Sequence, residues 1–215
     1  MRNFFDKQLE ELNAKLITMG EKCELGIKLA IDAIFDETSN LGNSVVQVSD
    51  IEQEINDLER DIESMCMNLL LKQQPVAGDL RMVSSALKMS SDMERIGDQS
   101  LDIVEMAGYV RDKEVSGKIH LKAMAAATTK MVNDSIAAFV DKDLEMARYV
   151  ISYDDVVDDF FDKIKGELIE LLAREDKYGE VFIDLLMIAK YLERIGDHAT
   201  NIAESVEFYL TGNRD

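Results

Sequence analysis

Apolar residues recur every three or four positions along most of this chain of 215 residues. This spacing places them on one side of an α-helix, so the pattern predicts long amphipathic helices. A single proline and 11 glycines leave few of the residues that the many turns of a β-sandwich or barrel prefer. We therefore expect an all-α protein of six long helices, at residues 4–38, 44–73, 75–110, 118–140, 144–174 and 181–210.

The breaks between these stretches indicate how the helices begin and how they are connected. Ser44 is predicted to cap the second helix. Pro75 falls in the first turn of the third, where a proline is tolerated because its missing amide would have no partner there. Residues 111–117 are charged and read as a linker. The breaks at 141–143 and 176–180 are short, so their flanking helices are expected to be antiparallel neighbours.

An internal repeat divides the chain into two similar halves. Residues 94–105 read ERIGDQSLDIVE and residues 193–204 read ERIGDHATNIAE, so seven of twelve positions match at an offset of 193 − 94 = 99. The preceding helices match more loosely at an offset of 102, which aligns residues 48–56 with 150–158. The repeat predicts two pseudo-symmetric antiparallel three-helix bundles, spanning residues 1–113 and 114–215.

The repeated segment carries pairs of acidic side chains. Glu94 and Asp98 are four residues apart, as are Glu193 and Asp197, so each pair lies about 5–6 Å apart on a helix surface. Like charges at this spacing repel one another unless a cation intervenes. The oxygen ligands favour a hard divalent ion or iron. One turn farther along lie Asp102 and Asn201, and the helices expected to face the pairs offer further oxygen donors: Glu52, Asn56, Asp154 and Asp158.

Two interpretations of these acids remain open. Gly97 and Gly196 each cost about 1 kcal/mol relative to alanine inside a helix, which suggests the close approach of another backbone or of a ligand beside the acids. Alternatively, the acids form a solvated face on which Arg95 reaches Asp98 and Arg194 reaches Asp197. The first interpretation predicts a metal site and the second predicts ordinary surface.

Charge and composition exclude several classes of function. There are 24 Lys and Arg against 43 Asp and Glu, and the net charge of −19 argues against binding to nucleic acid or to an anionic membrane. The two histidines do not form the Glu-x-x-His pairs of di-iron bundles, and no nucleophile or P-loop motif occurs. The two cysteines are expected to be buried hydrophobic residues in a reducing compartment. We expect a cytoplasmic protein without catalytic activity, which contacts membranes only through partners.

Three stretches of the sequence resemble the PhoU family of phosphate-signalling regulators. They are the opening MRNFFDKQLEELNAKLITMGE, the junction KQQPVAGDLRMV, and the two ERIGD segments followed by DIVE and NIAE. The resemblance implies two three-helix bundles that hold metal ions or clusters on their surface through an acidic motif. Carried over to this sequence, that motif comprises Glu94 with Asp98 and Glu193 with Asp197, extended by Asp102 and Asn201.

The resemblance also implies a function and partners. Members of the family restrain the phosphate-starvation response and limit phosphate uptake, by linking the ATPase subunit of a phosphate ABC transporter to a sensor histidine kinase. The metal could be Fe, Zn, Mn, Mg or Ca. Long amphipathic helices make a homodimer plausible, and location at the inner face of the membrane would come through partners. The alternative is a metal-free helical scaffold that binds partners through its helix faces.

Overall fold

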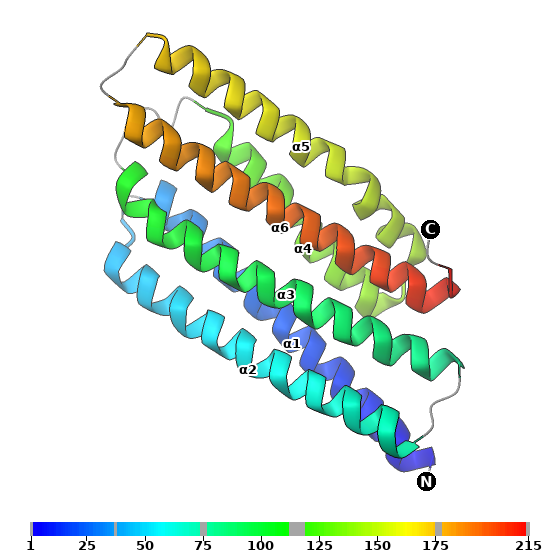
Figure 1. The fold of residues 1–215 in the computed structure, drawn as a ribbon. Coiled ribbons are helices and arrows are strands. Elements are labelled where there is room, and N and C mark those ends of the chain that lie inside the picture. The colour runs from blue at the N-terminus through cyan, green and yellow to red at the C-terminus, as the bar shows by residue number, and fades with distance from the viewer. Residues whose placement is uncertain (1, 37, 74–76, 112–118, 175–177, 214–215) are drawn as a thin grey trace.

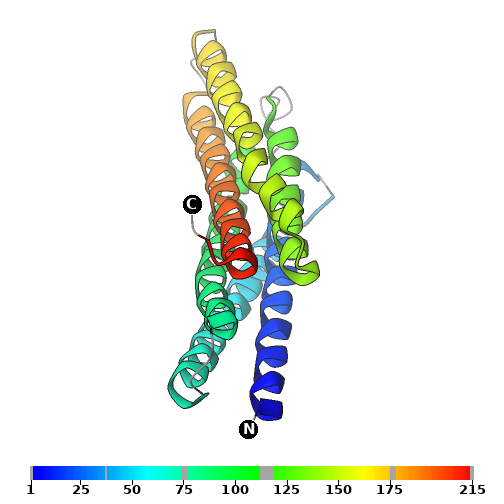
Figure 2. The ribbon, with the colours of Figure 1, turned by 90° about the vertical axis from the view of Figure 1, so that its right-hand side faces the viewer.

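The computed structural model describes residues 2–36, 38–73, 77–111, 119–174 and 178–213. These residues form long helices with no strand among them, which confirms the predicted all-α fold (Figure 1). The helices run along roughly the same direction, so the molecule is elongated (Figure 2). Their bounds are α1 Arg2–Phe35, α2 Leu41–Gln73, α3 Ala77–Val110, α4 Leu121–Asp141, α5 Leu144–Leu172 and α6 Gly179–Thr211.

Local side-chain hydrogen bonds explain why α1 ends, and why α2 begins, at residues other than those predicted. α1 ends at Phe35 rather than near Thr38, because the Asp36 carboxylate accepts hydrogen bonds from the backbone N–H (2.9 Å) and hydroxyl (2.6 Å) of Thr38 and closes a turn. The predicted cap of α2 at Ser44 is wrong. Asn40 caps this helix by accepting a bond of 3.1 Å from the backbone N–H of Asn43. Pro75 lies outside the described residues.

The second half shows similar shifts. α4 begins at Leu121, three residues later than expected, and Glu167 of α5 binds the residue that precedes it, because its Oε2 accepts a bond of 3.1 Å from the backbone N–H of His120. Asp143 caps α5 through the backbone N–H of Met146 at 3.0 Å. α5 ends two residues before the predicted position, and α6 begins two residues before it.

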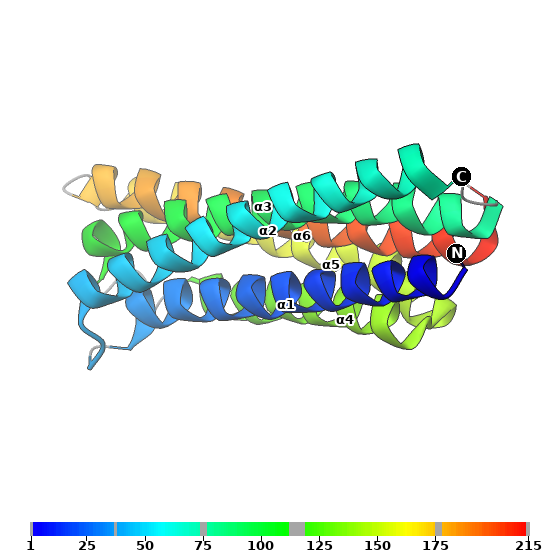
Figure 3. The same ribbon diagram turned by 90° about the horizontal axis from the view of Figure 1, so that it is seen from below.

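The helices pack in two triplets that share one apolar core. α1, α2 and α3 contact one another, as do α4, α5 and α6. The triplets meet where α3 packs on α6 and α1 packs on α4, and α1 and α4 lie side by side along one edge (Figure 3). The buried apolar residues of both triplets form a continuous cluster. The predicted boundary at residues 113 and 114 falls outside the described residues, so the division into two domains stays a prediction.

The two cysteines lie inside the fold. Cys23 and Cys66 are both buried and free, as expected, and burial raises the pKa of each thiol to about 12. The described helices include none that is long and apolar enough to cross a membrane.

The packing of α3 on α6 follows a pseudo-twofold axis. Tyr191 of α6 hydrogen-bonds to Asp102 of α3, and Asn201 of α6 donates a bond of 3.2 Å to Oδ1 of Asp92 of α3. Residues 92 and 102 correspond to residues 191 and 201 at the offset of 99, so these contacts are symmetry-related positions of the repeat. We call this antiparallel contact the α3–α6 seam.

Candidate functional site

The repeated acids lie in two clusters, one between α2 and α3 and one between α5 and α6. The Coulombic effect of Glu52 helps to raise the pKa of Glu94, and those of Asp154 and Asp158 help to raise that of Asp197. The facing helices therefore bring their carboxylates near the repeated pairs, as the sequence predicted. We define the N-terminal acidic cluster as Glu52, Asn56, Glu59, Glu94 and Asp98, and the C-terminal acidic cluster as Asp154, Asp158, Glu193 and Asp197.

In the N-terminal acidic cluster, an arginine neutralises part of the charge. Arg95 places Nε 3.4 Å from Oε2 of Glu94 and Nη1 3.2 Å from Oδ2 of Asp98. The pKa of Glu94 is still raised, first by desolvation and then by Asp98. Asn56 donates to Glu52, and its Oδ1 is buried without a hydrogen-bond partner. This cluster therefore holds a buried amide oxygen that accepts no hydrogen bond from the described residues.

In the C-terminal acidic cluster, the carboxylates disturb one another more strongly. Desolvation, followed by the charges of Glu193, Asp154 and Asp158, raises the pKa of Asp197 to about 6. Desolvation, followed by the charges of neighbouring carboxylates, also raises the pKa of Asp154 and of Asp158. Lys190 pairs with Glu193 and is the cation that offsets part of this repulsion. The carboxylates of this cluster thus carry more negative charge than Lys190 offsets.

The arginine contacts expected for a plain solvated face are present in one half only. Arg95 reaches Asp98, as that interpretation predicted. Among the described residues no ion pair joins Arg194 to Asp197; Arg194 instead acts on Asp102 and Tyr191. The cation of the second cluster comes from the preceding turn of α6.

Asp102 and Asn201, the two outer members of the predicted motif, lie in the α3–α6 seam. Asp102 accepts from Tyr191, and Asn201 donates to Asp92. The charge of Asp98 helps to raise the pKa of Asp102, so this side chain also borders the N-terminal acidic cluster. Their role as metal ligands stays a prediction, and their contacts link the two triplets.

The two glycines beside the acids are explained by packing between helices. A Cβ built on Gly97 would lie 3.0 Å from Cδ1 and 3.3 Å from Cγ2 of Ile55 in α2. A Cβ on Gly196 would lie 3.3 Å from Cγ1 of Val157 in α5. Residues 55 and 157 correspond at the offset of 102. The close approach inferred from the sequence therefore comes from an apolar side chain of the facing helix.

The donor chemistry suits a hard cation, although the carboxylates are not gathered into a coordination shell. Both clusters consist of carboxylate and amide oxygens, the ligands that Mg²⁺, Ca²⁺, Mn²⁺ and iron accept. Within the described residues, no three His, Cys, Asp or Glu side chains are close enough together to hold an ion. A metal would have to draw these side chains inward, and the unsatisfied Oδ1 of Asn56 and the repulsion around Asp197 would both be relieved by it.

Sequence analysis missed the polar residues of the seam. Oδ1 of Asp92, which is 8% exposed, lies 2.9 Å from Nδ1 of His198 and also accepts from Asn201. The signal was available, because Asp92 corresponds to Tyr191 and His198 to Gln99 at the offset of 99. Polar residues at equivalent positions of a repeat, next to apolar neighbours, are candidates for the contact between its halves.

The comparisons with known proteins agree over the whole chain. The PhoU domain family matches residues 16–107 and 121–206. A protein of Clostridium acetobutylicum, named phosphate-specific transport system accessory protein PhoU homolog, is 32% identical and aligns over 99% of this chain and 97% of its own. A Synechocystis protein of the same name is 34% identical, over 100% and 94%.

Two solved structures have the same fold. The crystal structure of PhoU from Pseudomonas aeruginosa superposes with a TM-score of 0.88 at 30% identity, covering 97% of this chain and 100% of that one. The phosphate transport system regulatory protein PhoU from Streptococcus pneumoniae superposes with a TM-score of 0.83 at 26% identity, covering 98% and 99%. The likeness therefore includes both triplets together.

Proposed function

Because the chain belongs to the PhoU domain family, we propose that it is a regulator accessory to a phosphate transport system and that it acts without catalysis. The observation that carries this proposal is the likeness along the entire chain to relatives named as accessory proteins of phosphate-specific transport. The regulator represses the phosphate-starvation response and limits phosphate uptake. It does so by coupling a phosphate ABC transporter, through the ATPase subunit, to a sensor histidine kinase.

The charge and shape of the protein support such a coupling role. The net charge of −19 suits docking on basic protein surfaces, and does not suit nucleic acid or an anionic bilayer. Exposed faces of α2 and α5, the outer helices of the two triplets, leave room for two partners. In this proposal the protein is cytoplasmic, reaches the inner face of the membrane through its partners and forms a homodimer.

Deletion of the gene tests the regulatory role. In the deletion strain we expect phosphate-starvation genes to be transcribed in medium rich in phosphate, and the wild-type copy to restore repression. Transcript levels and uptake of labelled phosphate measure the two effects. Normal repression in the deletion strain would refute the proposed role.

The same proposal includes metal binding at the two acidic clusters. The ligands are Glu94 and Asp98 on α3 and Glu193 and Asp197 on α6, with Asp102 and Asn201 as outer members. When bound, a divalent metal or iron would supply positive charge that offsets the repulsion between the carboxylates. The raised pKa of Asp197 and the unpartnered Oδ1 of Asn56 support this assignment.

Elemental analysis separates this assignment from the alternative of a metal-free scaffold. The alternative is favoured by Arg95 and Lys190, which already bind acids of the two clusters. Protein purified without chelator is compared with a variant in which the four acids Glu94, Asp98, Glu193 and Asp197 are replaced by Ala. We expect bound Fe, Zn, Mn, Mg or Ca in the wild type and its loss in the variant, with unchanged helical circular dichroism.

In a matched control variant, Ala replaces four acidic residues that lie on helices but outside the two acidic clusters. Suitable positions are Asp57, Asp61, Glu145 and Glu170, which are exposed and engaged in surface ion pairs. This variant has the same change in net charge and should retain the metal. Equal metal content in both variants, or none in the wild type, would favour the scaffold.

A further inference from the structure

The pseudo-twofold axis relates the two ends of the α3–α6 seam, yet the sequence makes these ends chemically different. At the offset of 99, each residue at one end has a counterpart at the other. One end is polar and basic, and the other is apolar and acidic. The counterparts are Arg81 and Glu180, Ser84 and Ile183, Ser85 and Asp184, Lys88 and Met187, and Glu204 and Glu105.

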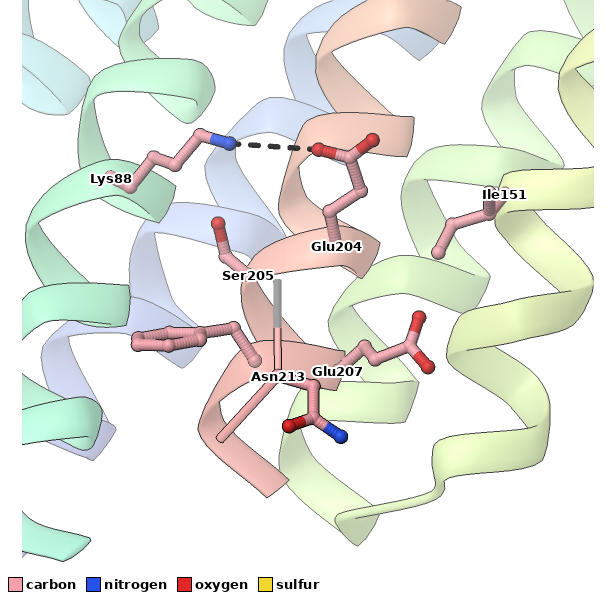
Figure 4. A pocket seen from close by; sticks show the side chains of 7 residues that line it. Lys88, Ile151, Glu204, Ser205, Glu207 and Asn213 are labelled. Atoms are coloured by element: carbon pink, nitrogen blue, oxygen red, sulfur yellow. Dashed lines mark ion pairs between the residues drawn. The ribbon is translucent and has the colours of Figure 1, made fainter. Parts of the chain in front are cut away.

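The basic end is covered by the chain's own C-terminal turn. Arg81 donates from Nε to the backbone oxygen of Tyr209 at 3.4 Å, and Gly212, with φ of 79°, packs on the guanidinium group. Asn213 lines a pocket of about 200 Å³ at this end, together with Lys88 and Glu204 (Figure 4). Lys88 and Glu204 form an ion pair of 3.7 Å across it. Both basic side chains at this end, Arg81 and Lys88, are therefore bound by acceptors of the chain itself.

The other end exposes large apolar side chains. Tyr109 of α3 is 66% exposed, and Ile183 and Met187, one turn apart on α6, are 64% and 39% exposed. Tyr109 and Ile183 line a depression of about 280 Å³ together with Glu180 and Asp184. No described segment covers these side chains as the C-terminal turn covers their counterparts. An exposed apolar group of this kind, with a polar rim, is typical of an interaction surface.

The rim of this surface is acidic. Glu105, Glu180 and Asp184 form no ion pair within the described part of the chain. Arg194, two turns beyond Met187 on α6, is engaged by Asp102 and Tyr191. The surface thus presents apolar anchors surrounded by carboxylates that have no ion-pair partner among the described residues.

We propose that this end of the seam, which we call the seam dock and define as Glu105, Tyr109, Glu180, Ile183, Asp184 and Met187, binds a basic amphipathic helix of a partner protein. The exposed ridges of two antiparallel helices offer a groove for a third helix, whose apolar face packs on Tyr109, Ile183 and Met187. Its lysines and arginines pair with the acidic rim. The inference rests on the proposed function only for the identity of the partner, a component of phosphate transport or sensing.

A second copy of the chain fits the seam dock poorly. Two docks facing each other would bring three carboxylates against three, and like charges in contact oppose association. The basic end of another copy is occupied by its own C-terminal turn. The acidic rim likewise repels an anionic membrane.

The proposal is tested with a synthetic helical peptide of about 18 residues, with Leu at helical spacing and Lys elsewhere, long enough to form a helix alone. Binding to the full chain is measured by fluorescence anisotropy. Any cationic peptide is attracted to a chain of charge −19, so measurements at high salt isolate the apolar contribution. A peptide with Glu in place of Lys controls for the charge.

The decisive comparison uses two isoleucines of similar exposure. Ile183→Ser removes an anchor of the seam dock, whereas Ile169→Ser alters an isoleucine on α5 that is 61% exposed. We expect the first to raise the Kd about tenfold, as for a central interface residue, and the second to leave it within about twofold. Tyr109→Ser provides the same measurement from α3.

Three results would overturn the proposal. They are absence of peptide binding by the wild type, equal effects of Ile183→Ser and Ile169→Ser, and a dimer in sedimentation that only Ile183→Ser dissociates. The assay involves neither phosphate nor metal. A failure here is therefore distinct from a normal phosphate response in the deletion strain.

Discussion

Gly97 offers a direct measurement of how closely α2 packs on α3. In Gly97→Ala, the added Cβ would lie 3.0 Å from Cδ1, 3.3 Å from Cγ2 and 3.6 Å from Cβ of Ile55. Carbon atoms pack comfortably at about 3.5–4.0 Å, so Ile55 has to move by roughly half an ångström. Ile55 is fully buried and β-branched, and its stiff χ1 holds Cγ2 in place, so rotation about χ2 relieves only the contact with Cδ1.

Two opposing effects set the size of the change. Alanine improves helix propensity by about 1 kcal/mol relative to glycine. Overpacking in a well-filled core costs about 1–3 kcal/mol. We therefore expect Gly97→Ala to lower the free energy of unfolding by about 1 kcal/mol. Gly166, inside α5, has no atom within 4 Å of a built Cβ, so Gly166→Ala should raise it by about 1 kcal/mol.

Urea unfolding followed by helical circular dichroism measures both variants. In the double variant Gly97→Ala/Ile55→Val, the atom that makes the 3.0 Å contact is absent, so the two changes should cost less together than the sum of their separate costs, by about 1 kcal/mol. If Gly97→Ala stabilised the protein as much as Gly166→Ala, the packing explanation for this glycine would be wrong.

Three further changes test single contacts. In protein stripped of metal with a chelator, Asp197→Asn should stabilise the fold at pH 7 by on the order of 1 kcal/mol after allowance for its exposure, because the raised pKa of about 6 makes the charged form unfavourable. The gain should fade as pH falls from about 6 to below 3.8, where the wild type is protonated both folded and unfolded; an equal gain at pH 7 and pH 3.5 in urea titrations would contradict this. Glu167→Ala should cost about 1 kcal/mol in thermal melts by removing the hydrogen bond to the backbone N–H that precedes α4, and more than His120→Ala, which keeps that bond. Ser85→Ala should cost about 1 kcal/mol in urea titrations, since Oγ donates a buried bond of 2.8 Å to the backbone oxygen of Ser205; a neutral change would show that bond to be unimportant.

The acidic clusters show how far a repeat in one sequence can predict a site. The spacing of Glu94 and Asp98, and of Glu193 and Asp197, placed each pair on one ridge, since a helix fixes neighbours four residues apart. The looser repeat at an offset of 102 identified Asp154 and Asp158 as facing donors, and their effect on Asp197 confirms that they are close. Which cations balance each cluster did not follow from the repeat.

The error at Ser44 and the interpretation of the glycines have the same origin. Capping depends on a side chain that accepts a hydrogen bond from a particular backbone N–H. Asn40, four residues before the predicted cap, accepts such a bond from Asn43. The cost of Gly97 inside a helix suggests a nearby backbone or ligand, whereas Ile55 fills that space. Local sequence records that a position must be small or polar, but the neighbour responsible lies on another helix.

Helical periodicity, scarce proline and an internal repeat were enough to predict six long amphipathic helices in two related halves, because these signals act through neighbours along the chain. The packing of the folded helices established that the halves meet along the α3–α6 seam, with Asp92 and Asp102 hydrogen-bonded across it. It also decided that one end of the seam is covered and the other exposed. These features depend on contacts between residues about a hundred positions apart, whose energies no local pattern encodes.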